Sequence, residues 1–248
     1  MFVKEKPKKS WIDTNGLDGK ILKNIILNSD CLITDLDGTI ADPAKQIAIY
    51  DNIFNGRILN PFFIYWAGKT GIKQIITGKE AESDSWKEYI KLFLRNVDEL
   101  HKIEEQFSNG KVESLLYLGV KEFYRLLPRN MLKILMTRNI LEIGDAFAVE
   151  LNISIVADEV FKKGREIELI IKQNPNFKRY VVFDDYEQDF EIVLDVLEFY
   201  KNRADKSKRI ESYSGIFVSD SENKLNRNAI ANIGRNYTNL VDIVKVVQ

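Results

Sequence analysis

Two aspartates placed two residues apart are the first residues in this sequence whose type and spacing could do chemistry. Asp35 and Asp37 directly follow the apolar run Cys31–Thr34, and Gly38 and Thr39 come next. Gly38 permits the backbone angles of a turn, so both carboxylates can face one crevice once the chain leaves the extended form. One carboxylate can act as a nucleophile that forms an aspartyl-phosphate, while a second acts as an acid for the leaving oxygen. The N–H groups of such a turn can hold phosphate oxygens.

Other polar residues stand where further apolar runs end. Thr137 follows Lys133–Met136, and Asp184 and Asp185 follow Tyr180–Phe183. Carboxylates from adjacent strand ends make a hard oxygen site that suits Mg²⁺. Such a cation lets an anionic carboxylate approach an anionic phosphate, and a hydroxyl and an ammonium group complete the cradle.

The elements that must position these residues alternate between strands and helices. Short apolar, β-branched runs predict five strands: Cys31–Thr34, Lys133–Met136, Ile153–Val156, Tyr180–Phe183 and Gly215–Val218. Helix-length segments lie between or beside them: Ile21–Leu27, Gly119–Leu127, Ile140–Leu151, Arg165–Gln173 and Asp189–Arg203. This alternation predicts an α/β fold, a doubly wound parallel sheet with helices on both faces. Ligands gather at the carboxyl ends of the strands in such sheets.

The stretch between the first two predicted strands is too long for a crossover. It runs from about Ala44 to about Glu113 and contains helical patterning at Trp86–Leu94. A structureless loop of that length is uncommon in a domain. We therefore expect an α/β core of residues 1–41 and 114–248 and a mostly helical inserted cap of residues 42–113. The arm before residue 20 is expected to be flexible or loosely docked, with Trp11 as an anchor. This arm and the segment beyond Asp220 could serve as interaction surfaces if the protein is not catalytic.

Composition excludes several classes of function. The 248 residues carry 36 basic and 37 acidic side chains, a net charge of −1, so no overall field favours nucleic acid or an anionic membrane. One cysteine excludes an intramolecular disulfide framework and a multi-cysteine zinc site, and one histidine argues against a Ser-His-Asp triad. No apolar run approaches the length of a spanning helix, and no signal segment is visible, so we expect a cytoplasmic protein. The oligomeric state stays open.

At this point the motifs resemble those of a known family. The segment Leu32–Thr39 looks like motif one of the haloacid dehalogenase-like (HAD) hydrolase superfamily in its phosphatase form. Residues that resemble the other three motifs follow in the family's order: Thr137, then Lys163 before a helix, then Asp184 and Asp185 with Asp189. The resemblance covers roughly residues 31 to 190. True dehalogenases do not carry the second aspartate of motif one, so Asp37 disfavours carbon–halogen cleavage.

The resemblance implies catalytic roles for residues of motif one. Asp35 would be the nucleophile and a metal ligand. Asp37 would be general acid for the leaving group and then general base for water, and its backbone carbonyl would contact the metal. Thr39 would support the loop.

The resemblance also implies binding roles. Thr137, Arg138 and Lys163 would bind the phosphoryl group, with Lys163 neutralising the charge between Asp35 and the phosphate. Asp185 would ligate Mg²⁺ directly, and two further carboxylates would lie behind it, Asp189 and Asp184.

The identity of the motif lysine has alternatives. Lys162 and Lys163 are neighbours, and the family motif needs one lysine. The pairing of Lys163 with a glycine before a helix favours Lys163. Lys178 is a more remote choice because it lies close to the next predicted strand.

Together these features predict a Mg²⁺-dependent phosphatase that hydrolyses a small phosphorylated metabolite through an aspartyl-phosphate. Two alternatives remain at this point. One is a phosphotransferase or mutase of the same superfamily, in which a substrate hydroxyl accepts the phosphoryl group. The other is a non-catalytic binding or regulatory protein on the same fold, because fold alone does not imply function.

Overall fold

The computed structural model describes residues 10–43, 45–46, 105, 107, 111–137, 139, 141–157, 162–205 and 209–245. The strands of these ranges are β1 (Ile12–Asp13), β2 (Cys31–Thr34), β3 (Leu132–Met136), β4 (Ile155–Ala157), β5 (Arg179–Asp184), β6 (Ser212–Ser219) and β7 (Ala231–Gly234). The helices are α1 (Gly19–Leu27), α6 (Lys111–Leu115), α7 (Val120–Leu126), α8 (Leu141–Leu151), α9 (Lys163–Gln173), α10 (Glu187–Lys201) and α11 (Thr238–Lys245).

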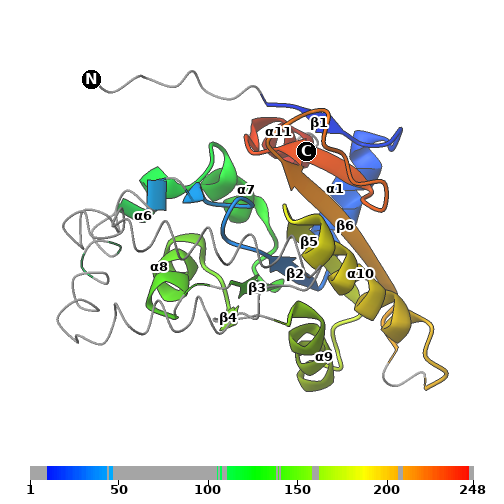
Figure 1. Cartoon of the computed structure of the whole chain (residues 1–248). Helices are drawn as coiled ribbons and strands as arrows, with labels where there is room; N and C mark the ends of the chain where they lie inside the picture. Colours follow the sequence, from blue (N-terminus) through cyan, green and yellow to red (C-terminus); the bar gives the residue numbers. More distant parts are fainter. Residues whose placement is uncertain are drawn as a thin grey trace, which may run out of the picture. The chain divides into compact units, whose positions relative to one another are not determined.

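The described strands form one sheet in the order β1-β7-β6-β5-β2-β3-β4 (Figure 1). β1 pairs antiparallel with β7, and the other described pairings are parallel. The predicted fold class, an α/β fold with a mostly parallel sheet, is confirmed.

Alternation of side chains along the central strands divides the core between the two faces of the sheet. In β5, Val182 belongs to the buried cluster that Phe190 of α10 and Ile167 of α9 help to form. The next residue, Phe183, points the other way and contacts Phe123 of α7 at a ring-centroid distance of 5.4 Å. It also stacks with Tyr237 at 6.3 Å. Both faces of β5 are therefore covered, which explains why its middle residues, Tyr180–Phe183, form a continuous apolar run.

The chain reverses direction across the sheet between β2 and β5. From β2 it proceeds outward through β3 and β4, and it then returns to β5 and continues through β6 and β7. In open α/β sheets, ligands bind at this kind of switch point, outside the carboxyl ends of the strands. Asp35 follows β2 and Asp184 ends β5, so both aspartates lie at the switch point.

The N-terminal arm and the segment beyond Asp220 each contribute a strand to the sheet. The segment beyond Asp220 supplies β7 and α11, and the arm supplies β1. The backbone N–H of Gly234 donates to the carbonyl of Trp11 at 3.0 Å, and a Cβ at Gly234 would overlap the Trp11 indole. β1 is two residues long, and β7 contains the polar Asn232 and ends in glycine, so neither has the continuous apolar run from which the other strands were predicted.

The chain divides into two compact units, residues 1–42 with 116–248, and residues 43–115. Most of the predicted cap, residues 42–113, lies outside the described residues. In the second unit the described parts include α6 and a hydrogen bond from Lys45 Nζ to the carbonyl of Ser114 at 3.0 Å. In the described part of the chain, no helix combines the length and the apolar character needed to cross a bilayer.

Candidate active site

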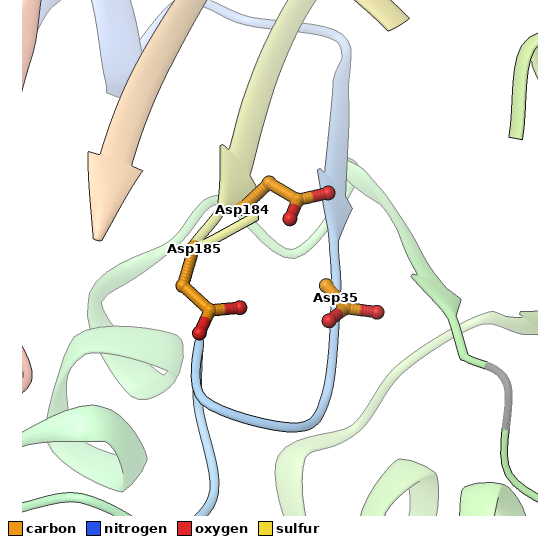
Figure 2. Close-up of side chains that lie close together, drawn as sticks. All are labelled: Asp35, Asp184 and Asp185. Atoms are coloured by element: carbon orange, nitrogen blue, oxygen red, sulfur yellow. The ribbon is translucent and has the colours of Figure 1, made fainter. Parts of the chain in front are cut away.

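Three carboxylates converge at the carboxyl edge of the sheet. Asp35, Asp184 and Asp185 each offer one oxygen, and these oxygens lie within 4.8 Å of one another (Figure 2). The strands set their positions. Asp35 N donates to the carbonyl of Phe183 at 3.1 Å, and this bond keeps the carboxyl ends of β2 and β5 in register. A group of carboxylate oxygens is the donor set that Mg²⁺ prefers, so these three residues could hold a hard divalent cation.

The turn after β2 brings Asp185 close because one of its residues lacks a side chain. Gly38 has a φ of 82°, in the left-handed region, and a Cβ there would overlap the carboxylate of Asp185. The hydroxyl of Thr39 donates to Asp185 Oδ1 at 3.1 Å, and Arg235 Nη2 donates to Asp185 Oδ2 at 2.9 Å. Each oxygen of Asp185 is thereby oriented by a donor from a different element.

Lys163 joins several carboxylates. Its Nζ lies 2.7 Å from Asp184 Oδ2, 3.2 Å from Asp189 Oδ2 and 3.3 Å from Asp35 Oδ1. The side chain is 2% exposed, so the ammonium interacts with these carboxylates almost without solvent screening. Asp189, in the first turn of α10, contacts Lys163 and is not among the three residues grouped as possible metal ligands.

Helix phase distinguishes the candidate lysines. Lys163 is the first residue of α9 and lies on the buried face with Ile167 and Ile170, at positions i, i+4 and i+7. Lys162 is exposed. Lys178 donates to the carbonyl of Arg209 at 3.0 Å. Of these three described lysines, Lys163 is the one that lies with the carboxylates.

The site is electrostatically costly without a cation. Burial raises the pKa of Asp35 well above its usual range; Lys163 opposes this, while the neighbouring carboxylates, Asp184 first, raise the pKa further. Burial also raises the pKa of Asp184, against the effect of Lys163. Burial alone would lower the pKa of Lys163, but the nearby carboxylates, Asp35 first, raise it overall. A divalent cation would reduce the repulsion among the carboxylates, which is a second reason to expect one here.

The residue after β3 also faces this edge. Thr137 is buried, and its backbone N–H continues the ladder by donating to the carbonyl of Ala157 at 2.9 Å. Its hydroxyl accepts a hydrogen bond from the backbone N–H of Asn139 at 3.0 Å. The side chain of Asn139 in turn donates to Asp37 Oδ2 at 2.7 Å. Thr137 and Asp37 are thus connected through one asparagine, while Arg138 lies outside the described residues.

The sequence analysis missed three residues that contact the site. They are Asn139, Arg235 and Tyr237, whose hydroxyl donates to the carbonyl of Thr39 at 3.1 Å. Arg235 directly follows β7, and its guanidinium group lies 5.8 Å from the ring centroid of Tyr117. The rule that picked out Asp35 and Thr137, a polar residue at a strand end, would have found Arg235 if β7 had been predicted.

Comparison with known proteins gives a likeness of fold. No family model matches the chain, and no curated protein does. One matching solved structure, from Burkholderia xenovorans, is described as a haloacid dehalogenase-like hydrolase, with 12% identity, a TM-score of 0.45, and coverage of 76% of this chain and 82% of that one. The UTR4 protein of Saccharomyces cerevisiae matches with 10% identity and a TM-score of 0.47 over 82% of this chain and 96% of that one. A Lactobacillus plantarum structure described as a phosphoglycolate phosphatase matches with 15% identity and a TM-score of 0.41 over 68% of this chain and 82% of that one.

Proposed function

We propose that this protein is a Mg²⁺-dependent phosphatase that hydrolyses a small phosphorylated metabolite through an aspartyl-phosphate. The observation that carries the proposal is the convergence of Asp35, Asp184 and Asp185 on one point beside the Lys163 ammonium. A carboxylate nucleophile, a carboxylate cation site and a buried ammonium are the groups that phosphoryl transfer to an aspartate needs. Non-catalytic use of the fold would not require four charged groups to be held together at the cost of burial.

The first half-reaction transfers the phosphoryl group to the enzyme. An oxygen of Asp35 attacks phosphorus, the bond from phosphorus to the ester oxygen breaks, and Asp37 gives its proton to that leaving oxygen. Lys163, Thr137 and Arg138 hold the oxygens of the transferring group. Mg²⁺ held by Asp35, Asp185 and the Asp37 carbonyl, with Asp184 and Asp189 behind, would supply positive charge where the two anions meet.

The second half-reaction returns the enzyme to its starting state. Asp37, now ionised, takes a proton from a water molecule whose oxygen attacks the phosphorus of the aspartyl-phosphate. The bond from phosphorus to the Asp35 oxygen breaks and inorganic phosphate leaves. Asp37 regains its proton and Asp35 its negative charge, so the cycle balances.

A matched pair of variants tests this proposal. Hydrolysis of 4-nitrophenyl phosphate is measured with Mg²⁺ and with a chelator, for wild type, Asp35→Asn and Asp30→Asn. Asp30 precedes β2, so the control makes the same substitution at the other end of the same strand. We expect turnover that requires Mg²⁺, is lost in Asp35→Asn and is retained in Asp30→Asn. Undiminished turnover in Asp35→Asn would contradict the proposed nucleophile.

Isotope-labelled water separates hydrolysis from transfer to another acceptor. A phosphatase places the label in the released phosphate, because water attacks the aspartyl-phosphate. A phosphotransferase or mutase hands the phosphoryl group to a substrate hydroxyl, so its product carries no label from water. A phosphorylated product without label from water would contradict the phosphatase proposal and favour the phosphotransferase or mutase.

A further inference from the structure

Asn139 is a buried amide at the site that the mechanism above does not use. It is 6% exposed. Its Nδ2 donates to Asp37 Oδ2 at 2.7 Å, and its backbone N–H donates to Thr137 Oγ1 at 3.0 Å. One residue therefore contacts both the turn after β2 and the residue that ends β3, although Asp37 and Asn139 are 102 residues apart in sequence.

The backbone around Asp37 is fixed by the turn itself. Gly38 N donates to the carbonyl of Ala41 at 2.9 Å, and Ala41 N donates to the carbonyl of Leu36 at 3.0 Å. These bonds place the Cα of Asp37 but do not set the torsion angles of its side chain. The carboxyl group is half-buried, and contacts to its oxygens decide how it is oriented.

The bond from Asn139 supplies such a contact. The amide N–H donates to a lone pair of Asp37 Oδ2, and because a carbonyl oxygen accepts a hydrogen bond better than a carboxylic-acid hydroxyl does, this bond favours the acidic proton on Oδ1. The amide is neutral, so it adds no charge beside a group that must give up and then recover a proton. The same residue occupies a lone pair of Thr137 Oγ1, which directs the hydroxyl proton of Thr137 away from Asn139.

We infer that Asn139 is a positioning residue that orients the carboxyl group of Asp37 for proton transfer to the leaving oxygen and, later, from water. The inference rests on the proposed function, because Asp37 acts as acid and base only in that reaction. It predicts that loss of Asn139 weakens proton transfer and spares the other parts of the site.

Two aryl phosphates that differ by one nitro group, and hence in the basicity of the leaving group, distinguish this role from a structural one. The leaving group of phenyl phosphate is a basic phenoxide that needs a proton, whereas 4-nitrophenolate leaves without one. We expect Asn139→Ala to lower kcat/KM for phenyl phosphate by about 30-fold or more and for 4-nitrophenyl phosphate by about threefold, since general acid catalysis contributes roughly 10²-fold or more. An equal loss for both esters would overturn the inference.

A double variant shows whether Asn139 acts through Asp37. In an Asp37→Asn background, adding Asn139→Ala should cause no further loss of kcat/KM for phenyl phosphate, because the group that Asn139 orients is already disabled. Losses that multiply would mean that Asn139 acts independently of Asp37, and the inference would fail.

Two further variants control for folding. Asn139→Ser keeps a polar side chain too short to reach Asp37, and it should show the same dependence on leaving group even if Asn139→Ala does not fold. Asn232→Ala removes a fully buried amide of β7 whose Oδ1 accepts from Asn226 N, and it should lose stability without changing the ratio of the two esters. Wild type that hydrolyses neither ester with Mg²⁺ would overturn the proposed function. Active wild type with an unchanged ratio in both Asn139 variants would overturn this inference alone.

Discussion

An aspartate lies at each end of the edge that β2 and β5 share, and the surroundings shift the pKa values of the two aspartates in opposite directions. At the amino end, Asp30 Oδ2 accepts backbone hydrogen bonds from Lys178 and Arg179, both at 2.9 Å, and Oδ1 accepts from Arg179 Nη2 at 2.7 Å. Burial acts to raise the pKa of Asp30, but these hydrogen bonds, led by the Arg179 side chain, lower it overall. At the carboxyl end, burial raises the pKa of Asp35.

The contrast shows which end of the sheet contributes to stability. The amino end pairs a carboxylate with its own donors, so ionisation favours the folded state. The carboxyl end gathers Asp35, Asp184 and Asp185 around one ammonium, so ionisation opposes folding until a cation or substrate arrives. Sites that function at the expense of stability are expected in proteins that sit just above their stability threshold.

The largest expected effect follows from removing the nucleophile. Asp35→Asn should lower kcat by about 10⁴-fold or more, because the amide of asparagine cannot replace the carboxylate that forms the covalent intermediate. Asp30→Asn should leave kcat within about twofold. Steady-state kinetics with 4-nitrophenyl phosphate measures both, and a comparable loss in Asp30→Asn would remove the distinction between the two ends.

Removing the ammonium should cause the next largest effect. Lys163→Met leaves Asp184 and Asp189 buried without the ammonium group that pairs with them. We therefore expect a loss of about 3–5 kcal/mol in the free energy of unfolding. Lys162→Met, at the exposed neighbour, should change it by less than about 0.5 kcal/mol. Urea denaturation without divalent cations tests this pair, and similar values for the two variants would contradict the burial of Lys163 among carboxylates.

The two aspartates should respond to pH with opposite signs in the cation-free protein. The folded-state pKa of Asp30 is below the ordinary value of 3.8, so its contribution is present above that pH and is lost as pH falls through the folded-state pKa. Asp30→Asn should therefore cost about 1 kcal/mol at pH 7, and this difference should disappear in acid.

For Asp35 the folded-state pKa lies above 3.8, so wild type loses stability as pH rises from 3.8 through that higher value. Asp35→Asn should be more stable than wild type at pH 7, by about 1 kcal/mol, and this advantage should vanish near pH 4. Urea denaturation from pH 3 to pH 8 measures both aspartates. If Asp30→Asn and Asp35→Asn changed the free energy of unfolding at pH 7 in the same direction, the contrast between the amino and carboxyl ends of the strands would be contradicted.

The last expected effect, similar in size to the two pH effects, is stabilisation by the cation. Mg²⁺ at about ten times its Kd should add about 1.4 kcal/mol, a few degrees in Tm, by mass action. Asp185→Asn should abolish most of this shift, whereas Asp30→Asn should retain it. Thermal unfolding with and without Mg²⁺ is the measurement, and an undiminished shift in Asp185→Asn would exclude Asp185 from the cation site.

The predictability of this site from sequence depends on how local each signal is. Asp35, Thr137 and Asp184 were found because each follows an apolar run long enough to be recognised as a strand. Arg235 was missed because β7 contains the polar Asn232 and so lacks a continuous apolar run; the position of Asn232 in the sheet depends on pairing with β6. Lys163 was separable from Lys162 by the periodicity of Ile167 and Ile170, a local signal that the motif comparison did not use.

The turn after β2 carries one further consequence, for the history of such a sequence. At residue 38 a methyl group would occupy the place of an Asp185 oxygen, so no side chain is compatible with the assembled carboxylates. A gene copy that had lost the Asp185 side chain would be relieved of this overlap, but the left-handed backbone at residue 38 would still disfavour alanine or serine. Two independent constraints, the overlap with Asp185 and the left-handed backbone, therefore keep glycine at this position through sequence change.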